Sequence, residues 1–314
     1  MNAEIFAEWM RRQGRRVFRT SSSYWYEAGP HVLQAFPYHW LISPSEDEVR
    51  TLMLSRGMLS MRYSTLLNSP VGKISYHLIL HNPYNVDMLK PQAREGVIRG
   101  LEFSRVEQIS FERLATEGWT LQQDTLERRN QAKSMSQKDW ERVCRSAADL
   151  PGFEAWAAVS DGELAAAVII CQIDHTWCMP YELSHRKFLS QRIDNALCYD
   201  VSCNLLSREN VEGIFYKVQS LDAPSTADDF KLQMGLIPKP VRQKVDFHPW
   251  LSPLATTTTH RLFESLAERK HGDPLLAKTE GMLRFYIEGK QPMMDQNLPV
   301  CLLSGKRGNR KPVK

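Results

Sequence analysis

Apolar and polar residues alternate along this chain with two different periods, and stretches of each period follow one another along its length. Runs rich in β-branched and aromatic residues predict strands at 21–27, 59–63, 73–80, 176–183, 211–218 and 241–247. Apolar residues spaced three or four apart predict helices after Ser45 and Pro91 and within 111–118, 136–147, 189–205, 225–235, 261–268 and 275–287. Because both kinds of element are interleaved, the pattern predicts an α/β (α+β) protein with mixed sheets covered by helices.

Local signals predict where several of these helices begin and end. A serine three residues before an acid predicts N-terminal caps at Ser45, Ser136 and Ser225. Gly235 is predicted to end the short helix after Ser225, and Pro91 to begin another helix. That helix is predicted to place three apolar residues on one side, Val97, Ile98 and Leu101.

A hairpin and a linker predict how the chain is divided. Asp161-Gly162 separates strand-like runs at 153–159 and 164–173, and this dipeptide tolerates the positive φ angles of a tight turn. The segment 127–134 is polar and has no period, so it is predicted to be a linker. The predicted segments are 1–130, 131–253 and 254–314, the last being a helical extension with a basic tail.

The charge of the chain is concentrated at its end. The net charge of the 314 residues is +4, and residues 305–314 contain five Lys or Arg residues and no acid. Without these five charges the rest of the chain carries −1, which argues against a uniformly basic nucleic-acid-binding body. Two interpretations of the basic end stay open: a solubilising tail, or a contact with RNA or acidic lipid.

Other features of the composition indicate where the protein works. The beginning of the chain shows no secretory signal, and the longest apolar run, 164–170 and a little beyond, is too short to cross a bilayer. The six cysteines form no C-x-x-C pair and no zinc-ligand spacing. We therefore expect a cytoplasmic protein without a membrane span or a metal, and the oligomeric state is left open.

Several short motifs resemble one known family. Phe230-Lys231 with Gly235, then Pro240-Val241 and His248-Pro249, resembles the closing motif of the FemAB-like branch of the GNAT acyltransferase superfamily. Phe36-Pro37-Tyr38-His39 and Arg62-Tyr63 also resemble that group. The resemblance implies two GNAT-like units in tandem and transfer of an acyl or aminoacyl group to an amine. The donor would be an acyl-CoA or an aminoacyl-tRNA.

The resemblance also implies a reaction site in the second unit. There the strands 176–183 and 211–218 would run parallel and splay apart, and the donor would lie in the opening. Lys231 and Tyr216 are the predicted catalytic residues, with Phe230 packed beside the lysine. On the residues alone, an exposed surface lysine is the favoured interpretation of Lys231, and a core aromatic that of Tyr216. The tyrosine that many GNAT enzymes use has no match within 225–235.

The loop before the helix at 189–205 is the place where a CoA-using GNAT enzyme binds pyrophosphate. The predicted cofactor contacts there are Ser184, His185, Arg186, Lys187 and Arg192, and Phe230 is the sixth predicted cofactor contact. This loop contains no glycine between Ser184 and Arg192, although the family pattern is Gly-rich. Its side chains could bind phosphate of CoA or tRNA, or simply form an exposed charged surface.

An anionic acceptor is predicted to contact arginines of the first unit, because guanidinium groups match carboxylate and phosphate geometry. The predicted acceptor-binding residues are Arg62, Tyr63, Arg94, Arg99, Ser220 and Asp222. Two alternatives from other classes are kept. One is a catalytically silent GNAT-fold module that binds a ligand or a partner, and the other is an RNA-binding protein that uses its basic ends.

Overall fold

The computed structural model describes residues 2–129, 131, 134–222, 228–270 and 273–304. The chain forms two compact units, and each unit is built from several segments that alternate along the sequence. Unit 1 comprises 1–15, 79–217 and 228–237, and unit 2 comprises 16–78, 218–227 and 238–314. The units therefore divide the chain differently from the segments 1–130, 131–253 and 254–314, because strands β5 and β11 carry the chain from one unit to the other.

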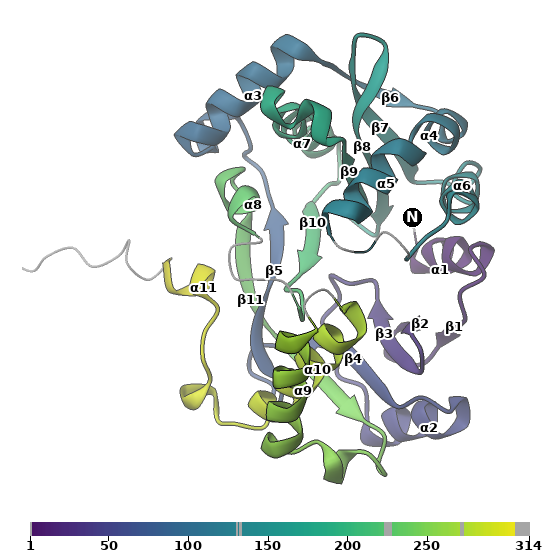
Figure 1. Ribbon diagram of the computed structural model, residues 1–314, viewed down its shortest axis with the longest axis vertical. Helices are drawn as coiled ribbons and strands as arrows, with labels where there is room; N and C mark the ends of the chain where they lie inside the picture. Colours follow the sequence, from purple (N-terminus) through teal and green to yellow (C-terminus); the bar gives the residue numbers. More distant parts are fainter. Residues whose placement is uncertain (1, 130, 132–133, 223–227, 271–272, 305–314) are drawn as a thin grey trace, which may run out of the picture. The chain divides into compact units, whose positions relative to one another are not determined.

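Unit 1 contains most of the helices between the N-terminus and residue 217 (Figure 1). Its helices are α1 (Ala3–Arg12), α3 (Pro91–Phe103), α4 (Phe111–Glu117), α5 (Trp119–Arg128), α6 (Gln137–Arg145), α7 (Ile193–Leu206) and α8 (Asp229–Gln233). Its strands are β6 (Arg105–Ile109), β7 (Phe153–Ser160), β8 (Glu163–Ile173), β9 (Thr176–Ser184) and β10 (Gly213–Val218). The strand order is β10-β9-β8-β7-β6, with β10 and β9 parallel and the other pairs antiparallel.

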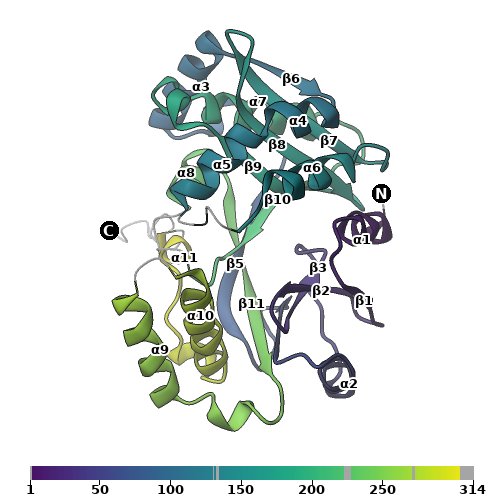
Figure 2. The ribbon, with the colours of Figure 1, turned by 45° about the vertical axis from the view of Figure 1, so that its right-hand side comes forward.

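Helices cover both faces of this sheet. On one face, Tyr181 of β9 contacts the rings of Trp9 in α1 and Trp140 in α6. Figures 1 and 2 show α4, α5 and α6 together beside β7, β8 and β9. Because side chains alternate along a strand, the neighbour Glu182 points to the opposite face, where α7 packs on β7 and β8 and contacts α3.

Unit 2 combines strands from the first quarter of the chain with β11 and the C-terminal helices. Its helices are α2 (Glu46–Arg56), α9 (Thr257–Arg269), α10 (Pro274–Gly289) and α11 (Val300–Ser304). Its strands are β1 (Val17–Arg19), β2 (Tyr24–Gly29), β3 (Val32–Phe36), β4 (Ser60–Thr65), β5 (Lys73–Leu80) and β11 (Ile237–Phe247). The order is β1-β2-β3-β4-β11-β5, and β3 and β4 form a parallel pair.

Helix α10 is part of the core of unit 2. Phe285 of α10 is fully buried, and Arg284 Nη2 donates to the carbonyl of Leu221 at 2.6 Å. The N–H of Gly72 donates to the carbonyl of Gly289 at 2.8 Å. Helices α9 and α10 lie side by side (Figure 2). The helices predicted at 261–268 and 275–287 are confirmed as α9 and α10.

Most of the predicted elements are confirmed. The hairpin at Asp161-Gly162 has φ angles of 52° and 83°, which its turn chemistry requires. The caps at Ser45 and Ser136 are both made, each accepting a hydrogen bond from the backbone N–H three residues on. Gly235 has the positive φ expected after a helix end.

Other predictions meet a different outcome. The prediction of the buried side of α3 is wrong in part. Val97 is buried, but Ile98 and Leu101 are exposed. Gly96 and Gly100 face α7 in their place. The cap at Ser225 and the basic tail at 305–314 lie outside the described residues.

In the described part of the chain, no helix combines the length and apolar character needed to cross a membrane.

Candidate functional site

An opening between β9 and β10 is the feature of unit 1 that the predicted site requires. The two strands pair in parallel through three positions, Thr176 with Gly213 up to Cys178 with Phe215. Beyond these positions β9 continues to Ser184, paired only with β8 in the described register. The register shift around Cys171 puts a bulge into β9 where the two strands separate. The predicted splay of these two strands is therefore present.

Three polar side chains from different elements meet at this opening. Lys231 of α8 donates to the carboxylate of Glu182 in β9 and to the hydroxyl of Tyr216, the first residue of β10 beyond the paired positions. The ammonium also lies 4.0 Å from the ring centroid of Tyr216 and 4.6 Å from that of Phe230. Lys231 is only 8% exposed, so the alternative of a solvated surface lysine is excluded. Tyr216 is 9% exposed and its hydroxyl faces the site.

The ionisation of this cluster follows from burial and from the charge of Lys231. Burial opposes ionisation of Glu182, but the lysine charge and hydrogen bonds from Lys231 and Tyr216 outweigh it, and they lower the pKa of the carboxyl. Burial and the neighbouring Glu182 raise the pKa of Tyr216 well above its usual value. Glu182 is therefore a carboxylate and Tyr216 a neutral phenol near neutral pH, and both contact the side chain of Lys231.

Helix α7 contributes a second carboxylate. Asp194 lies in the first turn of α7. Burial and the charge of Glu182 raise the pKa of Asp194, and Lys231 partly offsets the effect. A carboxyl group of the chain itself thus lies at the helix N-terminus, which is the kind of position where anions bind.

Two of the cations in the loop before α7 are paired. Arg186 pairs with Asp124 and, at 2.9 Å, with Glu127. Lys187 pairs with Glu163 at 2.7 Å.

The remaining predicted contacts of this loop are placed in different ways. The side chain of His185 accepts from the N–H of Lys187 at 3.1 Å. The hydroxyl of Ser184 accepts from Arg128 at 3.0 Å. Arg192 is exposed at the N-terminus of α7, with a φ of 60°. Assignment of the loop to a phosphate-bearing cofactor stays a prediction.

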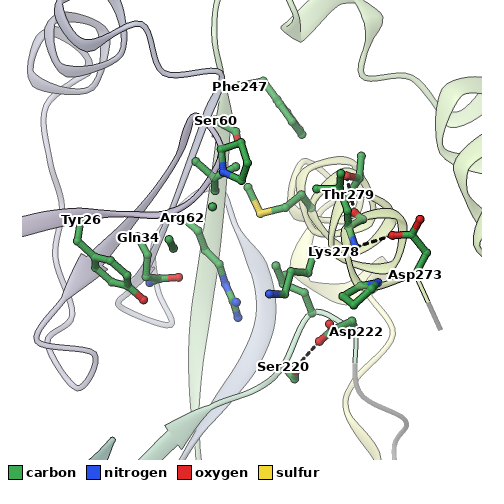
Figure 3. A pocket seen from close by; sticks show the side chains of 18 residues that line it. Tyr26, Gln34, Ser60, Arg62, Ser220, Asp222, Phe247, Asp273, Lys278 and Thr279 are labelled. Carbon is green, nitrogen blue, oxygen red and sulfur yellow. Dashed lines mark hydrogen bonds between the residues drawn. The ribbon is translucent and has the colours of Figure 1, made fainter. Parts of the chain in front are cut away.

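The predicted acceptor residues fall into three groups. Arg62, Ser220 and Asp222 line one pocket of about 680 Å³ in unit 2 (Figure 3). Tyr63 lies in the core of unit 2 and donates to Asp246 at 3.1 Å. Arg94 and Arg99 belong to α3 of unit 1. Their side chains are part-exposed and exposed, and Arg94 pairs with Asp87 at 3.4 Å.

Sequence reasoning missed Glu182 and Asp194. Glu182 is a single acid inside an apolar strand-like run, which was the available signal, but its partner Lys231 is 49 residues away. Asp194 interrupts an apolar helical stripe at its first turn. Among the described residues no group of His, Cys, Asp or Glu side chains is arranged to hold a metal ion.

Comparisons with known proteins agree on the fold. No protein-family model matches the chain, and no curated protein matches it in sequence. The C-terminal domain (DUF2156) of a putative lysylphosphatidylglycerol synthetase from Agrobacterium fabrum is similar in structure, with a TM-score of 0.54 and 10% identity over 84% of this chain and 91% of that one. A conserved protein of unknown function from Bacteroides thetaiotaomicron gives a TM-score of 0.52 and 12% identity, over 78% of this chain and 90% of that one.

FemX is a third similar structure, with a TM-score of 0.51 and 8% identity over 80% of this chain and 93% of its own. At such identities the likeness concerns the fold. The predicted resemblance to the FemAB-like branch is confirmed at that level, since this chain shares its fold with FemX.

Proposed function

We propose that this protein is a GNAT-fold acyltransferase, which moves an acyl or aminoacyl group onto an amine at the opening between β9 and β10. The observation that carries the proposal is the buried cluster of Lys231, Glu182 and Tyr216 at the point where these strands separate. Buried ionisable groups with perturbed pKa values are concentrated at functional sites. A cluster that served only packing would be more simply built from apolar residues.

The cluster can serve each step of the transfer. The amine nitrogen of the acceptor attacks the acyl carbonyl carbon, and the new C–N bond forms as charge develops on the carbonyl oxygen. The ammonium of Lys231 stabilises that oxygen. The carboxylate of Glu182 accepts the proton of the attacking amine. When the C–O or C–S bond of the donor breaks, the hydroxyl of Tyr216 donates a proton to the leaving atom.

Aminoacyl-tRNA is the donor that the geometry favours. A CoA pyrophosphate would need free amides or cations before α7. The cations of Arg186 and Lys187 are held by carboxylates, which leaves Arg192, and the carboxyl group of Asp194 in the first turn of α7 would repel a phosphate. The ester carbonyl of an aminoacyl-tRNA can enter the opening while its phosphates lie elsewhere.

A comparison of donors tests this proposal. The melting temperature of the full chain is measured with aminoacyl-tRNA, deacylated tRNA, acetyl-CoA and a longer acyl-CoA, since a ligand that binds the folded state alone raises it. We expect aminoacyl-tRNA to give the largest rise and acetyl-CoA to give none. If acyl-CoA is the donor instead, the rise appears with acyl-CoA, and the interpretation of Asp194 is wrong.

The catalytic role of Lys231 is tested by turnover. The Lys231→Met variant keeps the length of the side chain and loses its charge, so transfer of the labelled acyl group to an amine should slow by about 100- to 1000-fold. Lys138→Met, which changes an exposed lysine on α6, is the matched control and should keep the full rate. Transfer by Lys231→Met at the unaltered rate would contradict the assignment.

A silent binding module is the second candidate. The pairing of Lys231 with Glu182 leaves no uncompensated charge in this ion pair, which is compatible with a structural role. The two candidates differ in one result, because a silent module would bind the donor and release no acyl group over many hours.

A further inference from the structure

The pocket of unit 2 is lined by two cations and two carboxylates that form no ion pair with one another among the described residues. It has a volume of about 680 Å³, within the range of small-molecule sites, and it lies between β2, β3 and β4 on one side and α10 on the other. Its apolar wall consists of Val32, Leu221, Phe247 and Met282. Figure 3 shows the side chains of Arg62 and Lys278 pointing into the same space from opposite sides.

Arg62 is held so that one nitrogen remains available. Its Nε donates to Gln243 at 2.7 Å, and its Nη2 donates to Gln243 and, at 2.6 Å, to the carbonyl of Gln219. These contacts fix the plane of the guanidinium, while Nη1 has no hydrogen-bond partner among the described residues. Burial lowers the pKa of Arg62 to about 10, and the charges of Tyr26 and Asp222 partly oppose this shift. The group is therefore a desolvated cation at neutral pH.

The two carboxylates of the pocket, Asp222 and Asp273, form hydrogen bonds elsewhere and do not pair directly with its two cations. Neither Arg62 nor Lys278 forms an ion pair within the part of the chain that the structure describes. Asp222 accepts from the hydroxyl of Ser220 at 2.6 Å, and Asp273 accepts from the N–H groups that begin α10, at 2.9 and 3.3 Å. Arg62 is part-buried and Lys278 is exposed. A part-buried cation is stabilised by an anion with hydrogen-bonding oxygens, and the space beside Arg62 is open to one.

We propose that this pocket binds an organic oxyanion, a carboxylate or a phosphate carried on an apolar body. The oxygens would bridge Nη1 of Arg62 and Nζ of Lys278, and the apolar body would lie against Leu221, Phe247 and Met282. The hydroxyl of Ser220 borders the same space. This binding site is independent of the acyl transfer proposed for unit 1, and its occupant can be tested without any turnover.

The test uses four hexyl compounds with the full-length chain in isothermal titration calorimetry. They are hexyl phosphate, hexanoate, hexanol and hexylammonium, with inorganic phosphate as a fifth probe. We expect the two amphiphilic anions to bind and hexanol to bind at least tenfold more weakly, since hydrogen bonds to a charged group are the stronger ones. The ratio of hexyl phosphate to hexanoate distinguishes a phosphate ligand from a carboxylate ligand.

Variants then locate the site. Lys278→Met should weaken hexyl phosphate binding by about tenfold, and Asp222→Asn should strengthen it, because an acid beside the anion is removed. Lys270→Met, an exposed lysine of unit 2 outside the lining, should change nothing. Arg62→Lys keeps the positive charge and is used in case Arg62→Met fails to fold. It should still weaken the binding of hexyl phosphate. Equal binding of hexanol and hexyl phosphate, or unchanged binding in both Lys278→Met and Arg62→Lys, would overturn the proposal.

Discussion

Units 1 and 2 each contain a parallel strand pair that is paired through three positions, and the residue after the last pair differs in its role. In unit 1 this residue is Tyr216, which shares Lys231 with Glu182 at an opening. In unit 2 it is Tyr63, which is buried in the core and donates to Asp246. Related strand geometry thus holds a polar cluster in one unit and a packed aromatic in the other.

The charge in unit 2 lies on the opposite face of its strand. Arg62 precedes Tyr63, so alternation directs the guanidinium away from the core under α2 and toward α10, where it lies 5.7 Å from the ring centroid of Phe285. Lys231 has its counter-ion in the chain, whereas Arg62 has none in the described residues. We therefore assign the paired charge of Lys231 to the reaction on a bound molecule, and the unpaired charge of Arg62 to the binding of an anion.

The largest expected effect comes from removing one partner of the compensated pair. Glu182→Gln leaves the buried ammonium of Lys231 without its carboxylate, so the free energy of unfolding should fall by about 2 to 3 kcal/mol. Urea denaturation measures this change. The double variant Glu182→Gln with Lys231→Met should recover part of the loss, giving a coupling energy of about 1 to 2 kcal/mol.

The same cycle in unit 2 is the matched control. Arg62→Met combined with Asp222→Asn should show a coupling energy below about 0.5 kcal/mol, because the two side chains form no ion pair. A coupling energy as large as that of Lys231 and Glu182 would remove the difference between the two units.

Two glycines allow close contacts of the helices that position the two sites. Replacing either glycine with alanine should lower the free energy of unfolding by about 1 to 3 kcal/mol. A Cβ on Gly100 would lie 2.4 Å from the carbonyl oxygen of Arg192, just before α7, and one on Gly281 would lie 2.6 Å from that of Leu221. Gly29→Ala meets no atom within 4 Å and is the control. Thermal denaturation ranks the three variants.

These variants also separate the two sites. Gly281→Ala should weaken hexyl phosphate binding, because it moves α10 away from the pocket wall, and Gly100→Ala should leave that binding unchanged. Weakened hexyl phosphate binding in Gly100→Ala alone would place the anion site outside the pocket.

Local chemistry made much of the fold predictable. The turn at Asp161-Gly162 and the cap at Ser45 depend on neighbouring residues, and both are formed as expected. Helix α1 was omitted, although Phe6, Trp9 and Met10 have helical spacing. Ile98 was predicted to lie on the buried side of α3, but it is exposed, because two glycines and not large apolar residues form the contact of α3 with α7.

The site was less predictable because its partners are distant in sequence. Lys231 and Tyr216 were identified through the resemblance, but their link to Glu182 depends on where β9 and β10 stop pairing. Lys278 carries no local signal, since only the packing of α10 brings it opposite Arg62. Periodicity predicts which face of an element is buried, and it does not predict which charges meet there.

A pH series should separate the two carboxylates of unit 1. The pKa of Glu182 is lowered by folding, so its contribution to stability is present above its ordinary value of 4.5 and is lost as the pH falls through the lower folded value. The pKa of Asp194 is raised, so its ionisation reduces stability as the pH rises from 3.8 through the higher folded value. Asp194→Asn should therefore gain stability relative to the unaltered chain between pH 3 and neutral pH. Urea denaturation across this range checks it, and a constant difference between the two proteins would contradict the assignment.

The smallest expected effect concerns the loop before α7. Lys187 pairs with Glu163, and both side chains are more than half exposed, so Lys187→Gln should change the free energy of unfolding by less than about 0.5 kcal/mol. Because the cation already has a carboxylate partner, the affinity for the acyl donor should also change by less than about twofold. Donor titrations at two salt concentrations measure this. A tenfold loss of donor affinity with a shallower salt dependence would assign the loop to the phosphates of the donor. Charged residues of unit 1 would then serve ligand binding, as we propose for unit 2.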